Sequence, residues 1–297
     1  MNQPAATAPP FPTLNFKRLD TLWLQVTGTL CNLACLHCFI SCGPKNDSHA
    51  FMTLEQVRDA LATANKQGVK EYYYTGGEPF MHPEIKTMIE ETLAQGPLTI
   101  LTNGILIDEE MAAWLAETFR TSRYNFDLRV SLDGTTKQEN DAIRGRGTFE
   151  QILSAVDRLV AAGLNPVITV TTCHAELDGE EGRQRFIDLL RERGLSQPRL
   201  KFLAPFKIGR EERRHGGEGA YRPSERLYVE DVPDPDTDHL QCDSCRMVTA
   251  KGVWPCPILI EVPEARMGDT LEDANHAIKL DHPACYTCHV EGVSCKT

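Results

Sequence analysis

Three cysteines within eight residues constrain this chain more than any other feature. They are Cys31, Cys35 and Cys38, and they directly follow an alternating apolar run at 22–26. That run predicts a strand whose carboxyl end leads into a cysteine loop. Thiolates at this spacing can surround one metal centre, and such soft ligands favour zinc, copper(I) or an iron–sulfur cluster. A closed structural zinc site needs four ligands, so three thiolates predict a centre with one open coordination position.

Strands and helices are predicted to alternate through residues 18–206. The predicted strands cover 22–26, 69–75, 98–101, 127–132, 167–172 and 199–203. The predicted helices cover 53–66, 83–95, 108–120, 149–162 and 180–193. Six strands, each but the last followed by a helix, predict an α/β fold with a parallel sheet and right-handed crossovers.

Length, charge and cysteine usage limit the class of protein. A chain of 297 residues predicts two units, or one barrel with an appendage. The net charge of −11 argues against a nucleic-acid or anionic-membrane partner, because both favour a basic surface. We find no signal-peptide pattern and no apolar run of the ~18 residues that a membrane span needs. Since disulfide frameworks are typical of small secreted domains, the eleven cysteines predict a cytoplasmic protein that binds metal.

A glycine-rich turn follows the second predicted strand. It consists of Gly76, Gly77, Glu78 and Pro79. The two glycines allow a backbone to approach a ligand closely, and the carboxylate beside them can pair with an ammonium group. Because ligands bind beyond the carboxyl ends of strands in parallel α/β folds, this turn is a candidate binding element.

Further polar residues occupy the same edge of the predicted sheet. Asn103 follows the third strand, and Ser131 and Asp133 end the fourth. Arg144 lies further along, and its guanidinium fits a carboxylate in a bidentate way. Simple Asx turns and a surface salt bridge are the alternative interpretations of these residues.

Together, the cysteine loop and these motifs resemble the radical S-adenosylmethionine (radical SAM) superfamily over about two-thirds of the chain. The resemblance implies an open (β/α)6 partial barrel over 18–206. It implies that Cys31, Cys35 and Cys38 bind three irons of a [4Fe–4S] cluster, whose fourth iron binds S-adenosylmethionine. His37 is a departure, because the family usually carries an aromatic residue before the third cysteine.

The resemblance also implies the contacts of S-adenosylmethionine. Residues 76–79 are expected to hold its amino group, and Ser131 to lie near the ribose and the methionyl end. Arg144 lies where peptide-modifying members carry an arginine that pairs with the ligand's carboxylate. Asn103 and Asp133 are expected to complete the cofactor site.

Six more cysteines lie near the end of the sequence. They are Cys242, Cys245, Cys256, Cys285, Cys288 and Cys295. By spacing alone, the two C-x2-C pairs could form a zinc site, although the gap between them exceeds that of common examples. Beside a radical SAM barrel, this block resembles a SPASM/twitch extension with auxiliary [4Fe–4S] clusters. One cluster could take Cys245, Cys256, Cys285 and Cys288, or two clusters could take three thiolates each and leave an open iron.

The remaining segments are assigned as follows. Residues 1–17 are expected to form a flexible arm, 207–240 a linker, and 241–297 a small Cys-rich auxiliary domain. The charged, glycine-rich start of 207–240 could instead form a lid or a bridge that contacts substrate. Cys173, after the fifth strand, is a candidate hydrogen-atom donor or a buried thiol, and Cys42 is expected to be inert.

The resemblance implies that the chain is an enzyme. A reduced cluster would cleave S-adenosylmethionine, and the resulting 5′-deoxyadenosyl radical would abstract hydrogen from a substrate. We expect oxidative modification of a peptide or protein side chain, with a flavodoxin- or ferredoxin-like electron donor and an auxiliary cluster that assists. The alternatives are dehydrogenation or epimerisation of a small polar metabolite such as an aminoglycoside-type sugar, and a non-catalytic zinc or redox-sensing protein.

Overall fold

An open, mostly parallel sheet organises the molecule. The computed structural model describes residues 10–214, 220–232 and 240–292. The sheet has eight strands in the order β7-β6-β5-β4-β3-β2-β8-β9. The strands are β2 (Thr21–Gln25), β3 (Glu71–Thr75), β4 (Leu98–Thr102), β5 (Phe126–Ser131), β6 (Val167–Thr171), β7 (Arg199–Leu203), β8 (Cys245–Thr249) and β9 (Gly252–Trp254).

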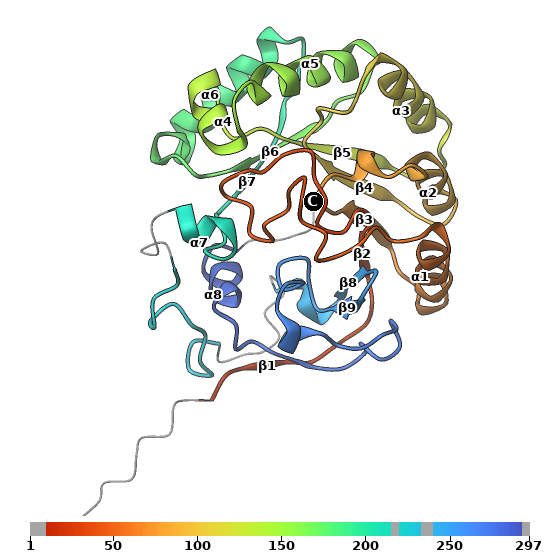
Figure 1. Ribbon diagram of the computed structural model, residues 1–297, viewed down its shortest axis with the longest axis vertical. Helices are drawn as coiled ribbons and strands as arrows, with labels where there is room; N and C mark the ends of the chain where they lie inside the picture. Colours follow the sequence, from red (N-terminus) through yellow and green to blue (C-terminus); the bar gives the residue numbers. More distant parts are fainter. Residues whose placement is uncertain (1–9, 215–219, 233–239, 293–297) are drawn as a thin grey trace, which may run out of the picture.

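Six helices cover the outer face of this curved sheet (Figure 1). They are α1 (Leu54–Gln67), α2 (Ile85–Leu93), α3 (Glu109–Thr121), α4 (Lys137–Arg144), α5 (Thr148–Ala161) and α6 (Gly179–Glu192). The helix α1 begins at the capping box formed by Thr53 and Gln56 and ends at Gly68, whose φ is 77°. The prediction of an α/β partial barrel is confirmed. The helix α4, between β5 and α5, was not predicted.

The C-terminal part of the chain lies on the side opposite these helices (Figure 1). It contributes β8, which pairs with β2 in parallel, and β9, which pairs with β8 antiparallel. A second, two-stranded sheet joins β1 (Thr13–Leu14) to β10 (Ile278–Lys279). The short helix α7 (Arg210–Arg214) and the helix α8 (Pro283–Val290) complete this side. The two added strands were not predicted, and they extend the barrel sheet beyond its six expected strands.

Side chains alternate between two apolar layers along each central strand. On β2, Leu22 and Leu24 pack with the helices, whereas Trp23 faces the inside of the barrel. Tyr73 of β3 stands opposite Trp23 in the strand register, and their rings stack with centroids 4.3 Å apart. None of the helices in the described segments has the length and apolar character needed to cross a bilayer.

Candidate active site

A cavity of ≈ 240 Å³ opens where the barrel strands end. It lies between the cysteine loop and the carboxyl ends of the strands, so residues far apart in sequence meet there. Eight of the predicted site residues line it: Cys31, Cys35, Cys38, Gly76, Gly77, Asn103, Ser131 and Arg144.

The cysteine loop packs directly on the glycine turn after β3. A Cβ atom on Gly77 would lie 1.8 Å from the carbonyl oxygen of Leu30, so only glycine allows this approach. The backbone N–H of Cys31 donates to the carbonyl of Gly43 at 3.2 Å, which closes the loop. The close approach at Gly77 and this hydrogen bond therefore hold the cysteine loop against the carboxyl ends of the strands.

The thiols of the loop differ in their electrostatic environment. Burial raises the pKa of Cys31 to about 12. The pKa of Cys38 is lowered to about 6, chiefly because the thiol of Cys42 donates a hydrogen bond to it. The backbone N–H of Cys42 also donates to Cys38 Sγ at 3.2 Å. The loop thus already stabilises one thiolate, the form that binds metal.

Glu78 is fully buried beneath the cavity and does not line it. Its carboxylate accepts hydrogen bonds from Thr102 Oγ1 at 2.7 Å and from the N–H of Asn103 at 2.8 Å. It also accepts one from the N–H of Phe80 at 3.1 Å, where Pro79 starts a 3-10 turn (Pro79–Met81). Burial raises the pKa of Glu78 to about 7. In this structure the carboxylate fixes the end of β4 relative to the glycine turn.

Asp133 is likewise fully buried, and it joins three parts of the site. Its Oδ2 lies 2.6 Å from His37 Nε2 and 2.7 Å from Arg144 Nε, and its Oδ1 accepts a hydrogen bond from Thr171 N at 2.8 Å. Burial opposes ionisation, but the charges of Arg144 and His37 hold the pKa of Asp133 well below its usual range. Arg144 in turn donates to Cys35 Sγ at 3.9 Å.

The other two strand-end residues, Asn103 and Ser131, also line the cavity. Asn103 Nδ2 donates to Asn32 Oδ1 at 2.7 Å and approaches Cys31 Sγ at 3.8 Å. Ser131 stands in register with Thr169 and Lys201 on the neighbouring strands, and all three line the cavity. This part of the lining therefore offers hydroxyl and ammonium groups to the cavity.

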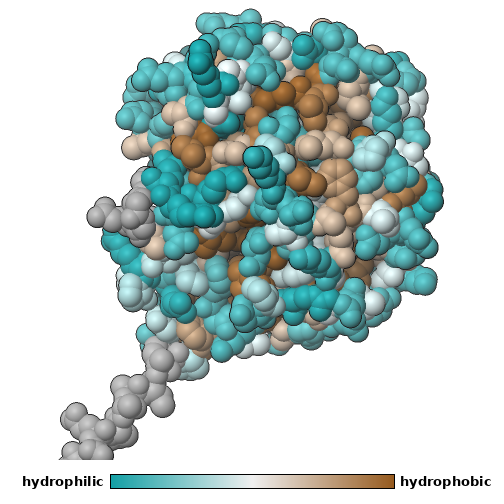
Figure 2. Space-filling model, in the orientation of Figure 1, coloured by the Kyte–Doolittle hydropathy of each residue, from teal (hydrophilic) through white to brown (hydrophobic). Residues whose placement is uncertain are grey.

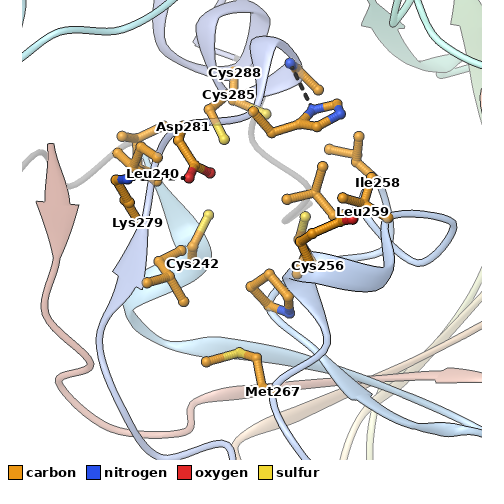
Figure 3. A pocket seen from close by; sticks show the side chains of 18 of the residues that line it. Leu240, Cys242, Cys256, Ile258, Leu259, Met267, Lys279, Asp281, Cys285 and Cys288 are labelled. Carbon is orange, nitrogen blue, oxygen red and sulfur yellow. Dashed lines mark hydrogen bonds and ion pairs between the residues drawn. The ribbon is translucent and has the colours of Figure 1, made fainter. Parts of the chain in front are cut away.

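A second cavity, of ≈ 480 Å³, gathers most of the C-terminal cysteines. Cys242, Cys256, Cys285 and Cys288 surround it (Figure 3). Cys245 lies elsewhere, because it starts β8, packs in the cluster around Trp23 and donates its thiol to the carbonyl of Pro255. The four thiols around one space are the set that could hold an auxiliary cluster.

The two remaining predicted residues are Cys173 and Cys295. Cys173 is half-buried after β6 and is absent from the lining of either cavity within the described segments. Burial raises its pKa. Its role as a hydrogen donor stays a prediction. Cys295 lies outside the described residues.

Sequence reasoning missed one residue at the cysteine loop. Arg210, in the segment expected to be a linker, lines the first cavity and contacts the loop backbone. The signal was the charged run that directly follows β7, for which a bridge was the alternative interpretation.

The model of the Radical SAM superfamily matches residues 26–197, which is more than half of the chain and includes the cysteine loop and the strand ends. The chain belongs to the radical SAM superfamily. Members of this superfamily are enzymes that use a [4Fe–4S] cluster and S-adenosylmethionine, and these are the cofactors of this chain.

The relatives of the chain have different activities. Mycofactocin maturase MftC of Mycobacterium tuberculosis is 34% identical over 134 residues, 45% of this chain and 32% of that protein. GTP 3′,8-cyclase of Chlorobaculum tepidum is 30% identical over 216 residues, 71% of this chain and 62% of that protein. The chain therefore spans about a third to three-fifths of the length of these two relatives.

A similar solved structure is anSMEcpe with bound AdoMet and a Cp18Cys peptide. It has a TM-score of 0.61 and 17% sequence identity, and the match covers 86% of this chain and 79% of that one. At this identity the similarity shows the shared fold.

The residues at the first cavity fit the cofactors of the family. The three predicted ligands of the loop line the cavity together with Cys42, and thiolates are the usual ligands of a [4Fe–4S] cluster. The described residues contain no three His, Cys, Asp or Glu side chains grouped so that they could hold a single metal ion. The thiols are instead distributed around a space that the glycine turn, Ser131 and Arg144 also border.

Proposed function

We propose that this chain cleaves S-adenosylmethionine reductively and uses the radical for oxidative modification of a peptide or protein side chain. The observation that carries the proposal is the single cavity that joins three loop cysteines, the glycine turn, Ser131 and Arg144. When bound there, the [4Fe–4S] cluster supplies one electron that converts S-adenosylmethionine into methionine and a 5′-deoxyadenosyl radical. The electron would come from an external donor of the flavodoxin or ferredoxin type.

The chain's own residues would bind and orient these groups. Cys31, Cys35 and Cys38 would hold the cluster, and the backbone of Gly76 and Gly77 would receive the amino group of S-adenosylmethionine. In our proposal Glu78 supports this turn from beneath and does not line the cavity. Its carboxylate accepts hydrogen bonds from Thr102 and Asn103 at the end of β4.

Further polar side chains around the cavity would contact the rest of the ligand. Arg144 would pair with the ligand's carboxylate, while Asp133 keeps its guanidinium charged and in place. Ser131 and Asn103 would donate hydrogen bonds to the sugar or the methionyl end. The apolar lining, which includes Phe206 and Leu203, would keep water and stray hydrogen donors away from the radical.

We further propose an auxiliary [4Fe–4S] cluster at Cys242, Cys256, Cys285 and Cys288, because these four thiols surround one cavity. This set replaces Cys245 of the one-cluster alternative with Cys242. An auxiliary cluster would accept an electron from the substrate or anchor it.

Modification of a peptide is our first choice because mycofactocin maturase is among the relatives. The second candidate is a reaction on a small polar molecule, and it is favoured by the similarity to GTP 3′,8-cyclase over 71% of this chain. The polar wall formed by Ser131, Thr169 and Lys201 suits either substrate class.

Iron, sulfide and 5′-deoxyadenosine measurements test the proposal. After anaerobic reconstitution, we expect about eight irons per chain, and about four in a variant with alanine at the three loop cysteines. Cys35→Ala should abolish 5′-deoxyadenosine formation with a strong reductant, whereas the matched control Cys173→Ala should retain it. Full 5′-deoxyadenosine formation by Cys35→Ala would overturn the assignment.

A further inference from the structure

The segment after the barrel forms hydrogen bonds to the backbone of the cysteine loop. Arg210, the first residue of α7, donates from its backbone N–H to the carbonyl of Cys38 at 3.1 Å. Its Nε donates to the carbonyl of Cys35 at 2.8 Å and its Nη1 to that of Ser41 at 2.9 Å. Its Nη2 donates to the carbonyl of Cys42. One residue therefore binds four carbonyl groups in an eight-residue stretch of the loop.

The backbone conformation next to Arg210 allows the segment to approach the loop this closely. Gly209 has a φ of 64°, and a Cβ atom there would lie 2.2 Å from the carbonyl oxygen of Phe39. Any other residue would push the segment away from the loop. A little earlier, Phe206 packs edge-on against Phe39 with ring centroids 5.6 Å apart. The contact with the loop thus involves Gly209 and Phe206 as well as the side chain of Arg210.

The chemistry of the arginine side chain suits this task. A guanidinium is planar and presents several N–H donors in a rigid fork, so it can bind several carbonyl groups at once, whereas an ammonium is a compact point charge. Within the described residues, no carboxylate forms an ion pair with Arg210. By contrast, Arg214 on the same helix pairs with Glu211 at 2.7 Å. Strongly hydrophilic side chains cover α7 on the surface (Figure 2).

We propose that Arg210 is a positioning residue for the catalytic cluster. By holding the carbonyl groups of Cys35, Ser41 and Cys42, it fixes the loop so that the thiolates of Cys35 and Cys38 face the cavity. The inference rests on the proposed function, because it assumes that these thiolates bind the cluster. Arg210 lines the cavity, but within the described residues its side-chain hydrogen bonds all go to carbonyl groups of the loop, so we assign it a role through the loop.

Amide hydrogen exchange of the loop in the reconstituted holoenzyme tests this role. The N–H groups of Cys38, Ser41 and Gly43 are hydrogen-bonded within the structure, so their exchange reports loop opening. Losing charged hydrogen bonds should make exchange in Arg210→Ala about ten- to a hundredfold faster. Arg210→Lys should fall between wild type and Arg210→Ala, because an ammonium cannot bind all three side-chain partners.

Two controls separate positioning from general loosening. Arg213→Ala removes a guanidinium from the same helix whose hydrogen bonds, within the described residues, go to Gly209 O and Ser41 Oγ, and it should change exchange by less than about threefold. Millimolar guanidinium added to Arg210→Ala should slow loop exchange, whereas the same concentration of ammonium should not.

Each outcome of this experiment decides something specific. Wild-type exchange in an iron-loaded Arg210→Ala protein, or equal acceleration by Arg213→Ala, would overturn the inference. If Arg210→Ala folds poorly, Arg210→Lys still decides the question, because wild-type exchange in that variant would overturn the inference. Failure of the proposed function would appear separately, as missing iron in the wild type.

Discussion

Nε2 of His37 lies 2.6 Å from Oδ2 of Asp133, a fully buried carboxylate just beyond β5. The same oxygen lies 2.7 Å from Nε of Arg144. His37, the residue before the third loop cysteine, and Arg144, which we propose binds the ligand's carboxylate, therefore contact the same oxygen of Asp133. His37 replaces the aromatic residue that the family usually carries, and this contact is what the replacement allows.

Removing that carboxylate should destabilise the protein strongly. Asp133→Ala leaves the buried guanidinium of Arg144 without its anion, and we expect a loss of about 3–5 kcal/mol of unfolding free energy. Urea unfolding of cluster-free protein measures it. Asp269→Ala is the matched control, because Asp269 is exposed and pairs with Arg266 at the surface; its loss should stay below about 1 kcal/mol. Equal losses in the two variants would contradict the role of Asp133.

Glu78 should make stability depend on pH. Burial raises its pKa to about 7 in the folded protein, against 4.5 for an ordinary glutamate. Between these pH values the folded state binds more protons than the unfolded state, so stability falls as pH rises, by ~1.4 kcal/mol per pH unit. Below this range and above about pH 7 the contribution is constant.

The substitution Glu78→Gln isolates this contribution because it removes the titrating group and keeps the shape. The difference in unfolding free energy, wild type minus variant, should decrease from about pH 4.5 to about pH 7. Urea unfolding at a series of pH values measures it. A constant difference would mean that the hydrogen bonds from Thr102, Phe80 and Asn103 keep the carboxylate ionised throughout.

Periodicity predicted the barrel because each central strand is a short run rich in β-branched, aromatic or aliphatic residues between turn signals. Glu71–Thr75 and Val167–Thr171 are examples, and both lie where they were expected. The strand β8 was missed because it starts at a cysteine, and a cysteine in a C-x2-C pair suggests a ligand before it suggests a strand. Its pairing with β2 depends on contacts more than two hundred residues apart, which a local pattern does not contain.

The sequence predicted which residues meet at the cavity, and their roles toward the cofactor stay predictions. Glu78 and Asp133 were expected as direct cofactor contacts, and the structure buries both as acceptors for neighbouring groups. Whether a strand-end carboxylate faces a cavity or the backbone beneath it depends on packing. Arg210 was missed for a similar reason, since its partners are carbonyl groups, which carry no sequence signature.

The two cysteines of the first C-terminal C-x2-C pair should behave differently. Cys242 lines the C-terminal cavity, whereas Cys245 packs against the barrel and donates to the carbonyl of Pro255. Cys242→Ser should lower the iron bound by the C-terminal site, because a hydroxyl is a poor ligand for iron–sulfur clusters. Cys245→Ser should retain that iron. Iron and sulfide analysis in a background without the loop cysteines measures both, and the reverse order of iron loss would contradict the ligand set.

Arg246 should connect this C-terminal site to the stability of the fold. Its side chain is fully buried on β8, and its guanidinium donates to four carbonyl groups. Two belong to Ala274 and His276, at 2.8 and 3.0 Å, and two to Cys242 and Cys245, at 2.8 and 2.6 Å. Replacing it with methionine, which is of similar length, removes the donor to four carbonyl groups, of which those of Ala274 and Cys245 are in buried hydrogen bonds. We expect Arg246→Met to lower the unfolding free energy by more than about 4 kcal/mol.

The same substitution should also weaken iron binding at the C-terminal site, because Arg246 fixes the backbone of Cys242. Arg123→Met is the matched control: Arg123 is exposed and stacks on Tyr124, so its replacement should change stability by less than about 0.5 kcal/mol and leave the iron content unchanged. Urea unfolding and iron analysis measure the two effects independently. If Arg246→Met unfolded like the wild type, the four carbonyl groups would have found other donors, and the C-terminal segment would not depend on this side chain for its position.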